Sequence, residues 1–294
     1  MKKIQLALIQ QGFSSDREDN IARSLQALRR AAAQGAELIV LPELHCTRYF
    51  CQTQNPANFD LAETIPGPTS EIFSRCAQEL DVVLVISLFE RRAAGLYHNT
   101  AVVIERDGTI AGCYRKTHIP DDPGYHEKFY FTPGDLGFHP VPTSIGKIGV
   151  LICWDQWFPE AARLMALAGA ELLLYPTAIG FDPADSAAIQ RRQLEAWLTI
   201  QRGHAIANAL PLAAVNRIGL EAHPKKDSQG IDFWGSSFIC GCQGEILAQA
   251  GQAREELVSY AVDLGYSEKV RRSWPFFRDR RTEAYRDLLK HYRD

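Results

Sequence analysis

Two stretches of this chain are alike: Gly35-Ala36-Glu37-Leu38-Ile39-Val40-Leu41-Pro42-Glu43 and Gly169-Ala170-Glu171-Leu172-Leu173-Leu174-Tyr175-Pro176-Thr177. In each, a predicted helix ends at the glycine, and a short apolar strand follows and ends at the proline. A unit that occurs twice, with similar surroundings each time, indicates an internal duplication.

The segments around both stretches predict the same order of elements, β-α-β-α-β-β-β. In the first half the ranges are 4–10, 18–34, 37–41, 69–80, 82–89, 98–105 and 109–114. In the second half they are 147–152, 159–168, 171–175, 188–209, 212–216, 236–240 and 245–249, with one more strand at 258–263. Asp107-Gly108 and Gln243-Gly244 are the turns of the two predicted hairpins.

The fold class follows from how apolar these strands are. A strand such as Val82-Val83-Leu84-Val85-Ile86 needs cover on both faces. Helices cover one face of each predicted sheet, and packing the two bare faces together covers the other. We therefore expect a four-layer α-β-β-α sandwich, with one domain over residues 1–265 and a C-terminal tail over 266–294.

Composition excludes several classes of protein. Of the 294 residues, 46% are hydrophobic and 23% charged, and 32 Lys and Arg against 35 Asp and Glu give a net charge of −3, which does not fit a nucleic-acid binder. No run reaches the roughly 18 apolar residues of a membrane span. The first ten residues read as a strand rather than a signal peptide. We expect a cytoplasmic protein that binds neither nucleic acid nor membrane.

The cysteines and histidines predict neither disulfides nor a metal site. The seven cysteines are an odd number at irregular spacing, which favours a reduced compartment. Cys240 and Cys242 have no matching Cys/His pair, and His118 and His126 lack the spacing of helical ligands.

Three chemically capable side chains follow predicted strands, where sites in α/β sheets collect. They are Glu43, Lys116 and Cys153. Each alone also fits a structural interpretation: an exposed strand-end carboxylate, a solvated basic loop or a buried thiol. The neighbourhood of Cys153 favours function, because a strand, a tight turn and a helix opening at Pro159 form an elbow with the thiol at its tip. Such an elbow is expected to bind an oxyanion, and the helix dipole to favour a thiolate.

These motifs resemble the nitrilase, or carbon–nitrogen hydrolase, superfamily. The matching contexts are Leu41-Pro42-Glu43, Tyr114-Arg115-Lys116-Thr117-His118-Ile119-Pro120 and Gly149-Val150-Leu151-Ile152-Cys153-Trp154-Asp155. The resemblance implies the α-β-β-α fold, a Glu-Lys-Cys triad, and a second glutamate matched by Glu127. It implies Glu43 as general base, Cys153 as nucleophile, and Lys116 with the Trp154 amide as oxyanion donors. It requires no cofactor and no metal.

Within the superfamily the chain is most similar to the N-carbamoylputrescine amidases, through segments such as Cys153-Trp154-Asp155-Gln156-Trp157-Phe158-Pro159-Glu160 and Trp274-Pro275-Phe276-Phe277-Arg278-Asp279-Arg280-Arg281. This implies hydrolysis of N-carbamoylputrescine, a small molecule, to putrescine, CO2 and ammonia. The candidate substrate-binding residues are Tyr125, Trp154, Asp155 and Asp182. Asp182 stands where those enzymes carry a glutamate. As alternatives, Asp155 braces the elbow, and Asp182 only shapes a turn before Pro183.

Two rival functions stay open at this stage. One is another carbamoyl-amine, carbamoyl-amino-acid or ω-amide hydrolase of the same superfamily; an acidic substrate would need an Arg or Lys in the pocket. The other is a catalytically silent scaffold, against which the complete triad argues. The basic tail, with nine Lys and Arg against five Asp and Glu from Ser267 to Asp294, also carries Trp274, Phe276, Phe277 and Tyr285. We expect it to dock on a neighbouring subunit of a homodimer or larger homo-oligomer.

Overall fold

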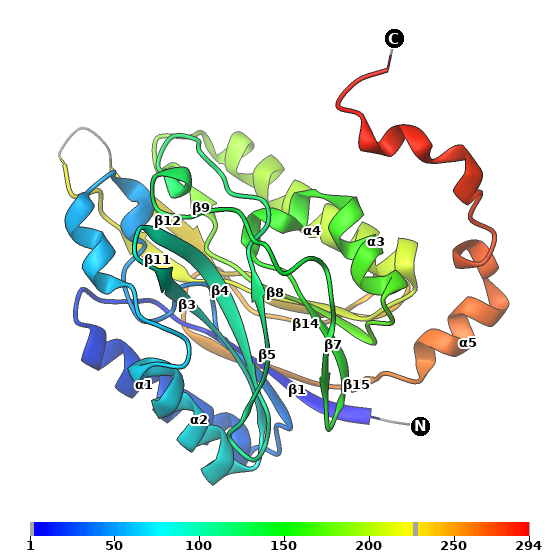
Figure 1. The fold of residues 1–294 in the computed structure, drawn as a ribbon, viewed down its shortest axis with the longest axis horizontal. Coiled ribbons are helices and arrows are strands. Elements are labelled where there is room, and N and C mark those ends of the chain that lie inside the picture. Colours follow the sequence, from blue (N-terminus) through cyan, green and yellow to red (C-terminus); the bar gives the residue numbers. More distant parts are fainter. Residues whose placement is uncertain (1–2, 226–228, 294) are drawn as a thin grey trace.

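Two six-stranded sheets form the centre of the molecule (Figure 1), in a computed structural model that describes residues 3–225 and 229–293. The first sheet has the order β15-β1-β2-β3-β4-β5, with β1 (Lys3–Gln10), β2 (Leu38–Val40), β3 (Val83–Ala93), β4 (Leu96–Ile104), β5 (Ile110–Arg115) and β15 (Glu256–Asp263). The second has the order β14-β13-β10-β8-β7-β6, with β6 (Val141–Thr143), β7 (Gly146–Val150), β8 (Leu172–Pro176), β10 (Leu212–Val215), β13 (Phe238–Cys240) and β14 (Ile246–Gln249).

Helices cover the outer faces of both sheets. They are α1 (Arg17–Ala33) and α2 (Pro68–Leu80) on the first sheet, and α3 (Pro159–Leu167) and α4 (Ala187–Asn208) on the second (Figure 1). The predicted four-layer α-β-β-α sandwich is therefore confirmed. Strand β1 shows why it forms: Leu6 and Leu8 pack into the core that contains the second sheet, whereas Ala7 and Ile9 pack under α1 and α2. Alternate residues of one strand thus bury both of its faces.

The duplication is visible in the sheet order. Read from β15 and from β6, each sheet has an antiparallel edge strand, then three parallel strands, then an antiparallel hairpin. The edge strand of the first sheet, β15, comes from the end of the second half and pairs with β1 from Lys3–Asp263 to Gln10–Glu256. The two halves therefore interlock and share one core.

Smaller elements complete the structure. A three-stranded sheet has the order β11-β12-β9, with β9 (Gly180–Phe181), β11 (Ile218–Glu221) and β12 (Ile231–Trp234). Short 3-10 helices are Phe50–Gln52, Pro56–Leu61, Glu127–Phe129, Cys153–Trp157, Pro275–Phe277, Thr282–Ala284 and Arg286–Leu289. In the described part of the chain, no helix has the length and apolar character to cross a membrane.

The first part of the tail packs on the body of its own molecule. Helix α5 (Tyr266–Ser273) packs Val270 against Ala209 and Cys242. The next segment, Pro275–Phe277, still contacts the body, because Phe277 packs against the main core and its ring lies 5.1 Å from the guanidinium of Arg163 on α3. After Phe277 the chain extends outward from the sandwich (Figure 1). The first part of the predicted tail is thus attached to the body of the same molecule.

Candidate active site

Glu43 is held by two donors and keeps one oxygen free. It follows β2 after Leu41-Pro42, and its side chain is fully buried. Its Oε1 accepts hydrogen bonds from Asn99 Nδ2 at 2.6 Å and from Lys116 Nζ at 2.8 Å. Its buried Oε2 has no hydrogen-bond partner among the described residues. That oxygen is available to take a proton.

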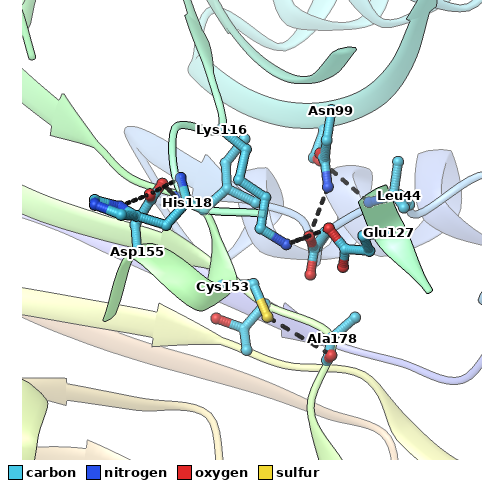
Figure 2. Close-up of polar contacts among 12 residues, drawn as sticks. Leu44, Asn99, Lys116, His118, Glu127, Cys153, Asp155 and Ala178 are labelled. Carbon is cyan, nitrogen blue, oxygen red and sulfur yellow. Dashed lines mark hydrogen bonds and ion pairs between the residues drawn. The ribbon is translucent and has the colours of Figure 1, made fainter. Parts of the chain in front are cut away.

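Lys116 lies between two carboxylates. It follows β5, is fully buried, and places Nζ 2.6 Å from Glu127 Oε2 (Figure 2), in addition to its contact with Glu43. Burial lowers the pKa of Lys116, but the negative charges of Glu127 and Glu43 outweigh burial and raise this pKa well above its ordinary value. The ammonium is therefore a stable positive charge inside the site.

Glu127 carries the second carboxylate on a short 3-10 helix, Glu127–Phe129. Its Oε1 accepts a hydrogen bond of 2.6 Å from the Tyr49 hydroxyl. Burial raises the pKa of Glu127 to about 7; Lys116 opposes this shift, and Glu43 adds to it. The charge on Glu127 consequently changes near neutral pH.

Cys153 stands at the tip of the predicted elbow. It follows β7 after Leu151-Ile152 and has a φ of +43°, a left-handed conformation that costs a non-glycine residue about 1–2 kcal/mol. Its Sγ donates to the Ala178 carbonyl at 3.7 Å (Figure 2). The turn that exposes the thiol to the charged cluster is thus a strained one.

The protonation state of Cys153 corrects one expectation. We expected the following helix to favour a thiolate, but burial first and Glu43 second raise the pKa of Cys153 well above its ordinary value. A 3-10 segment, Cys153–Trp157, separates the thiol from α3, whose first residue is Pro159. The resting group is a neutral thiol that needs a base.

Asp155 holds the elbow together. One carboxylate oxygen accepts from the backbone N–H of His118 at 3.0 Å and contacts His118 Nδ1 at 2.7 Å. The other accepts from the Tyr114 hydroxyl at 2.8 Å and from the Ile152 N–H at 2.9 Å. Both oxygens are occupied within the protein, so the geometry favours the bracing role over substrate contact.

A cavity of about 460 Å³ lies beside the loop that carries Tyr125 and His126, directly before Glu127, and the charged side chains of the cluster do not themselves line it. It is lined by Gln52, Gln54, Asp121, Asp122, Pro123, Gly124, Tyr125, His126, Phe181, Asp182, His223, Gly230 and Ile231. Tyr125 connects the cavity to the second carboxylate, because its ring lies 5.4 Å from that of Tyr49, whose hydroxyl binds Glu127. The half-buried Trp154 is not among these lining residues; its ring packs on Trp157.

Asp182 lines the cavity, and it also shapes a turn. The residue is exposed, and its Oδ1 accepts from the Ala184 N–H at 2.9 Å. Both sequence-based interpretations of Asp182 therefore have support in the geometry. In the described part of the chain, no group of three or more His, Cys, Asp or Glu is placed to hold a metal ion.

Sequence analysis missed three residues that the structure brings to the site. Asn99 on β4 binds Glu43, Tyr49 binds Glu127, and Asp122 lines the cavity with a buried Oδ1 that has no partner among the described residues. Asp122 lies six residues after Lys116 in a polar loop, a position that could have singled it out. Asn99 and Tyr49 carry no local signal, because they act through contacts distant in sequence.

Known proteins match this chain over nearly its whole length. It is 44% identical to an N-carbamoylputrescine amidase of Arabidopsis thaliana (98% of this chain, 96% of that one) and 42% identical to a citrullinase of Francisella tularensis (99% and 100%). A crystal structure of a carbon-nitrogen hydrolase from Helicobacter pylori G27 superposes with a TM-score of 0.97 at 54% identity, covering 99% of this chain and 100% of that one. The family model for carbon-nitrogen hydrolases matches residues 5–272. The chain therefore belongs to the carbon-nitrogen hydrolase family.

Proposed function

We propose that this protein hydrolyses N-carbamoylputrescine to putrescine, CO2 and ammonia. The observation that carries the proposal is the placement of three aspartates, Asp121, Asp122 and Asp182, around the cavity beside a buried Glu-Lys-Cys cluster. The cluster supplies a nucleophile for a carbonyl carbon, and the aspartates suit a substrate that ends in an ammonium. The similarity of this chain to N-carbamoylputrescine amidases from plants supports this choice of substrate.

The first half of the reaction begins at Glu43. Its unpartnered Oε2 takes the thiol proton of Cys153, which burial otherwise keeps on sulfur. The thiolate attacks the ureido carbon, and the carbonyl oxygen becomes negative. Lys116 and the backbone N–H of Trp154 stabilise that oxygen. A urea-type carbonyl is a weak electrophile, so a preformed positive charge at Lys116 suits it.

The second half returns the proton and consumes water. Glu43 gives its proton to the departing nitrogen, which leaves a thioester-type intermediate on Cys153. Glu43 then takes a proton from water, the resulting hydroxide attacks the intermediate and expels the thiolate of Cys153, and Glu43 returns the proton to the sulfur. The carbamic acid portion decomposes, so that one CO2, one ammonia and one putrescine result. Glu127 orients Lys116 throughout, through the contact of 2.6 Å.

The ammonium of the substrate lies about four methylenes from the reacting carbonyl, and we assign its recognition to Asp182. Tyr125 forms the wall between the triad and this carboxylate, and its hydroxyl accepts from the Gly180 N–H at 3.1 Å on the strand that precedes Asp182. Trp154 directly follows the nucleophile, and we assign its contribution to the backbone N–H, because its ring packs on Trp157. Asp155 contributes indirectly, by bracing the elbow.

Hydrolysis of citrulline is the second candidate, because a citrullinase is 42% identical over 99% of this chain. Citrulline carries the same ureido group and adds a carboxylate beside its ammonium. A carboxylate calls for an Arg or Lys partner, and the described residues that line the cavity include neither. The three aspartates there favour the substrate without a carboxylate.

A panel of ureides tests the proposal. Ammonia release is measured with N-carbamoylputrescine, citrulline and an N-carbamoyl amino acid under identical conditions. We expect the highest kcat/KM with N-carbamoylputrescine. A higher value with citrulline would assign the enzyme to the second candidate instead.

We also propose that residues beyond α5 dock on a second copy of this chain. Large apolar side chains there are exposed, with Leu288 at 65%, Leu289 at 95% and Tyr292 at 82%. Exposed apolar groups gathered on a segment that leaves the body are typical of a subunit contact. The arrangement fits at least a homodimer.

A further inference from the structure

Arg217 grips the backbone of the segment that carries Glu43. It follows β10 and is fully buried. Its Nε and Nη2 donate to the Glu43 carbonyl at 3.2 and 2.9 Å. Nη2 also donates to the Leu44 carbonyl at 2.6 Å, and Nη1 to the Thr47 carbonyl at 2.9 Å. One guanidinium thus binds three carbonyl groups of one short segment.

The segment that Arg217 binds has a strained backbone conformation. Leu44 has a φ of +50°, in the left-handed region that costs a non-glycine residue about 1–2 kcal/mol. Its N–H is satisfied by the Ser87 hydroxyl at 3.1 Å, and its carbonyl by Arg217. A strained conformation persists only where its surroundings enforce it. Arg217 helps to enforce this conformation through its hydrogen bond to the Leu44 carbonyl.

The guanidinium is held by Glu221, and contacts from Glu221 lead through Tyr49 to the carboxylate of Glu127. Glu221 Oε1 lies 2.9 Å from Arg217 Nη1, and Glu221 Oε2 accepts from the Tyr49 N–H at 2.6 Å. The hydroxyl of Tyr49 in turn donates to Glu127. The ring of Phe13 lies 4.6 Å below the guanidinium. The Arg217–Glu221 pair therefore connects the supports of both carboxylates that flank Lys116.

A buried ion pair of this kind contributes little net stability, because both charges lose their hydration. What the ion pair provides is a fixed orientation of the guanidinium. Only arginine offers five N–H donors in a rigid planar fork, and a lysine ammonium cannot bind three carbonyls spread along a chain in the same way.

We infer that Arg217 is a positioning residue for the reaction: it fixes the Glu43 backbone so that the free oxygen of that carboxylate faces the thiol of Cys153. This inference rests on the proposed role of Glu43 as the base. It predicts that loss of the fork impairs proton removal from the thiol and leaves substrate binding nearly unchanged.

The test combines turnover with a reaction that needs no substrate. Iodoacetamide alkylates Cys153 when sulfur displaces iodide and the thiol proton passes to Glu43, and peptide mass spectrometry follows that site alone. We expect Arg217→Lys to lower kcat by about 10²-fold, the cost of a small misplacement, with little change in KM. We expect it to slow alkylation of Cys153 at pH 7 by roughly tenfold or more.

The same substitution is then made in a Glu43→Gln background. If Arg217 acts through Glu43, Arg217→Lys has no further effect on alkylation there. An equal slowing in both backgrounds, or an Arg217→Lys enzyme that behaves as wild type, would overturn the inference. Glu43→Gln that alkylates as fast as wild type would instead refute the base assignment, and the inference with it.

Two further variants test whether a loss of activity results from misfolding. Arg217→Gln combined with Glu221→Gln removes both buried charges together and leaves no unpaired ion, so it is expected to fold and to show the same loss of kcat. Arg202→Lys is a control for the loss of an arginine–carbonyl hydrogen bond at an exposed position, because Arg202 Nε donates to the Gly244 carbonyl at 2.7 Å. It is expected to react as wild type. If the paired glutamine variant folds and keeps normal kcat, the inference is wrong.

Discussion

Lys116 and Glu127 form a fully buried ion pair in which Nζ lies 2.6 Å from Oε2. Because Glu43 contacts the same ammonium at 2.8 Å, two carboxylates share one positive charge. The cluster therefore carries one uncompensated negative charge when all three groups are ionised. Burial is the main cause that raises the pKa of Glu127 and of the Cys153 thiol, and the negative charge of Glu43 adds to both shifts.

The first prediction concerns stability and pH. The folded pKa of Glu127 is about 7, above its ordinary value of 4.5 in an unfolded chain. The folded state therefore binds the proton more tightly, and the stability this provides is complete below pH 4.5 and is lost as the pH rises through 7. Glu127→Gln mimics the protonated form. Its melting temperature relative to wild type should rise between pH 5 and pH 8.5. A difference that stays constant or falls over that range would contradict the assignment.

The second prediction concerns the nucleophile. Cys153→Ala should abolish ammonia release and leave the circular dichroism spectrum unchanged, because it removes one small side chain at a strand tip. Cys153→Ser should be nearly as inactive, since Glu43 is too weak a base for an alcohol. Cys76 is a matched control, being a buried thiol on α2, and Cys76→Ala should keep its activity. Substantial turnover by Cys153→Ala would refute the role of this residue.

The third prediction concerns the oxyanion site. Lys116→Met should lower kcat by at least the roughly 10²- to 10³-fold seen for one oxyanion donor. The variant keeps the apolar stem but leaves Glu43 and Glu127 facing each other without a cation. Thermal melting must accompany the kinetics, and the assignment fails if a folded Lys116→Met enzyme retains near-normal kcat.

The fourth prediction concerns the ammonium. An ion pair in a partly desolvated pocket contributes about 2–3 kcal/mol, so Asp182→Asn should raise KM for N-carbamoylputrescine by about 30- to 150-fold. KM for a ureide with a neutral alkyl tail should hardly change. Asp185→Asn is the control on the same loop, because Asp185 binds Gln193 and does not line the cavity. Equal losses on both substrates would show that Asp182 does not read the ammonium, and would direct attention to Asp122.

The fifth prediction concerns assembly. Replacing Leu288 and Leu289 together with aspartate should lower the mass measured by light scattering, because these side chains are exposed on the segment beyond α5. Leu220→Asp is a control, since Leu220 is also exposed, at 59%, but lies on β11 of the main body. If the mass of the double variant matches that of wild type, these residues do not form the contact.

Much of the fold could be predicted because its signals are local. Glycine and proline bound the repeated strands, and continuous apolar runs such as Val82-Val83-Leu84-Val85-Ile86 mark strands that are buried on both faces. The pairing of β15 with β1 could not be predicted in this way. It joins residues that are very distant in sequence, as in the pair Lys3–Asp263, and neither strand has a local feature that indicates which strand it pairs with. The strands β9, β11 and β12 have at most four residues, too few for a clear period.

In the candidate site, too, some residues could be predicted from local sequence signals and others could not. Glu43, Lys116 and Cys153 follow strands that the sequence marks, and the topology brings them together. Arg217 binds a carbonyl 174 residues away, and Asn99 binds Glu43 56 residues away. Such residues gain their roles only from the folded arrangement. The state of the Cys153 thiol also depends on burial, which raises its pKa, opposite to the shift that a helix dipole would produce.

One comparison tests the central proposal most directly: the kcat/KM of the wild-type enzyme for N-carbamoylputrescine against N-pentylurea, with ammonia release as the readout. The two ureides have nearly the same shape, and the terminal methyl of N-pentylurea replaces the ammonium. We predict that N-carbamoylputrescine is preferred by at least about 30-fold, the value of the lost ion pair. Equal values for the two ureides, or a preference for N-pentylurea, would contradict the proposal that this cavity selects a cationic ureide.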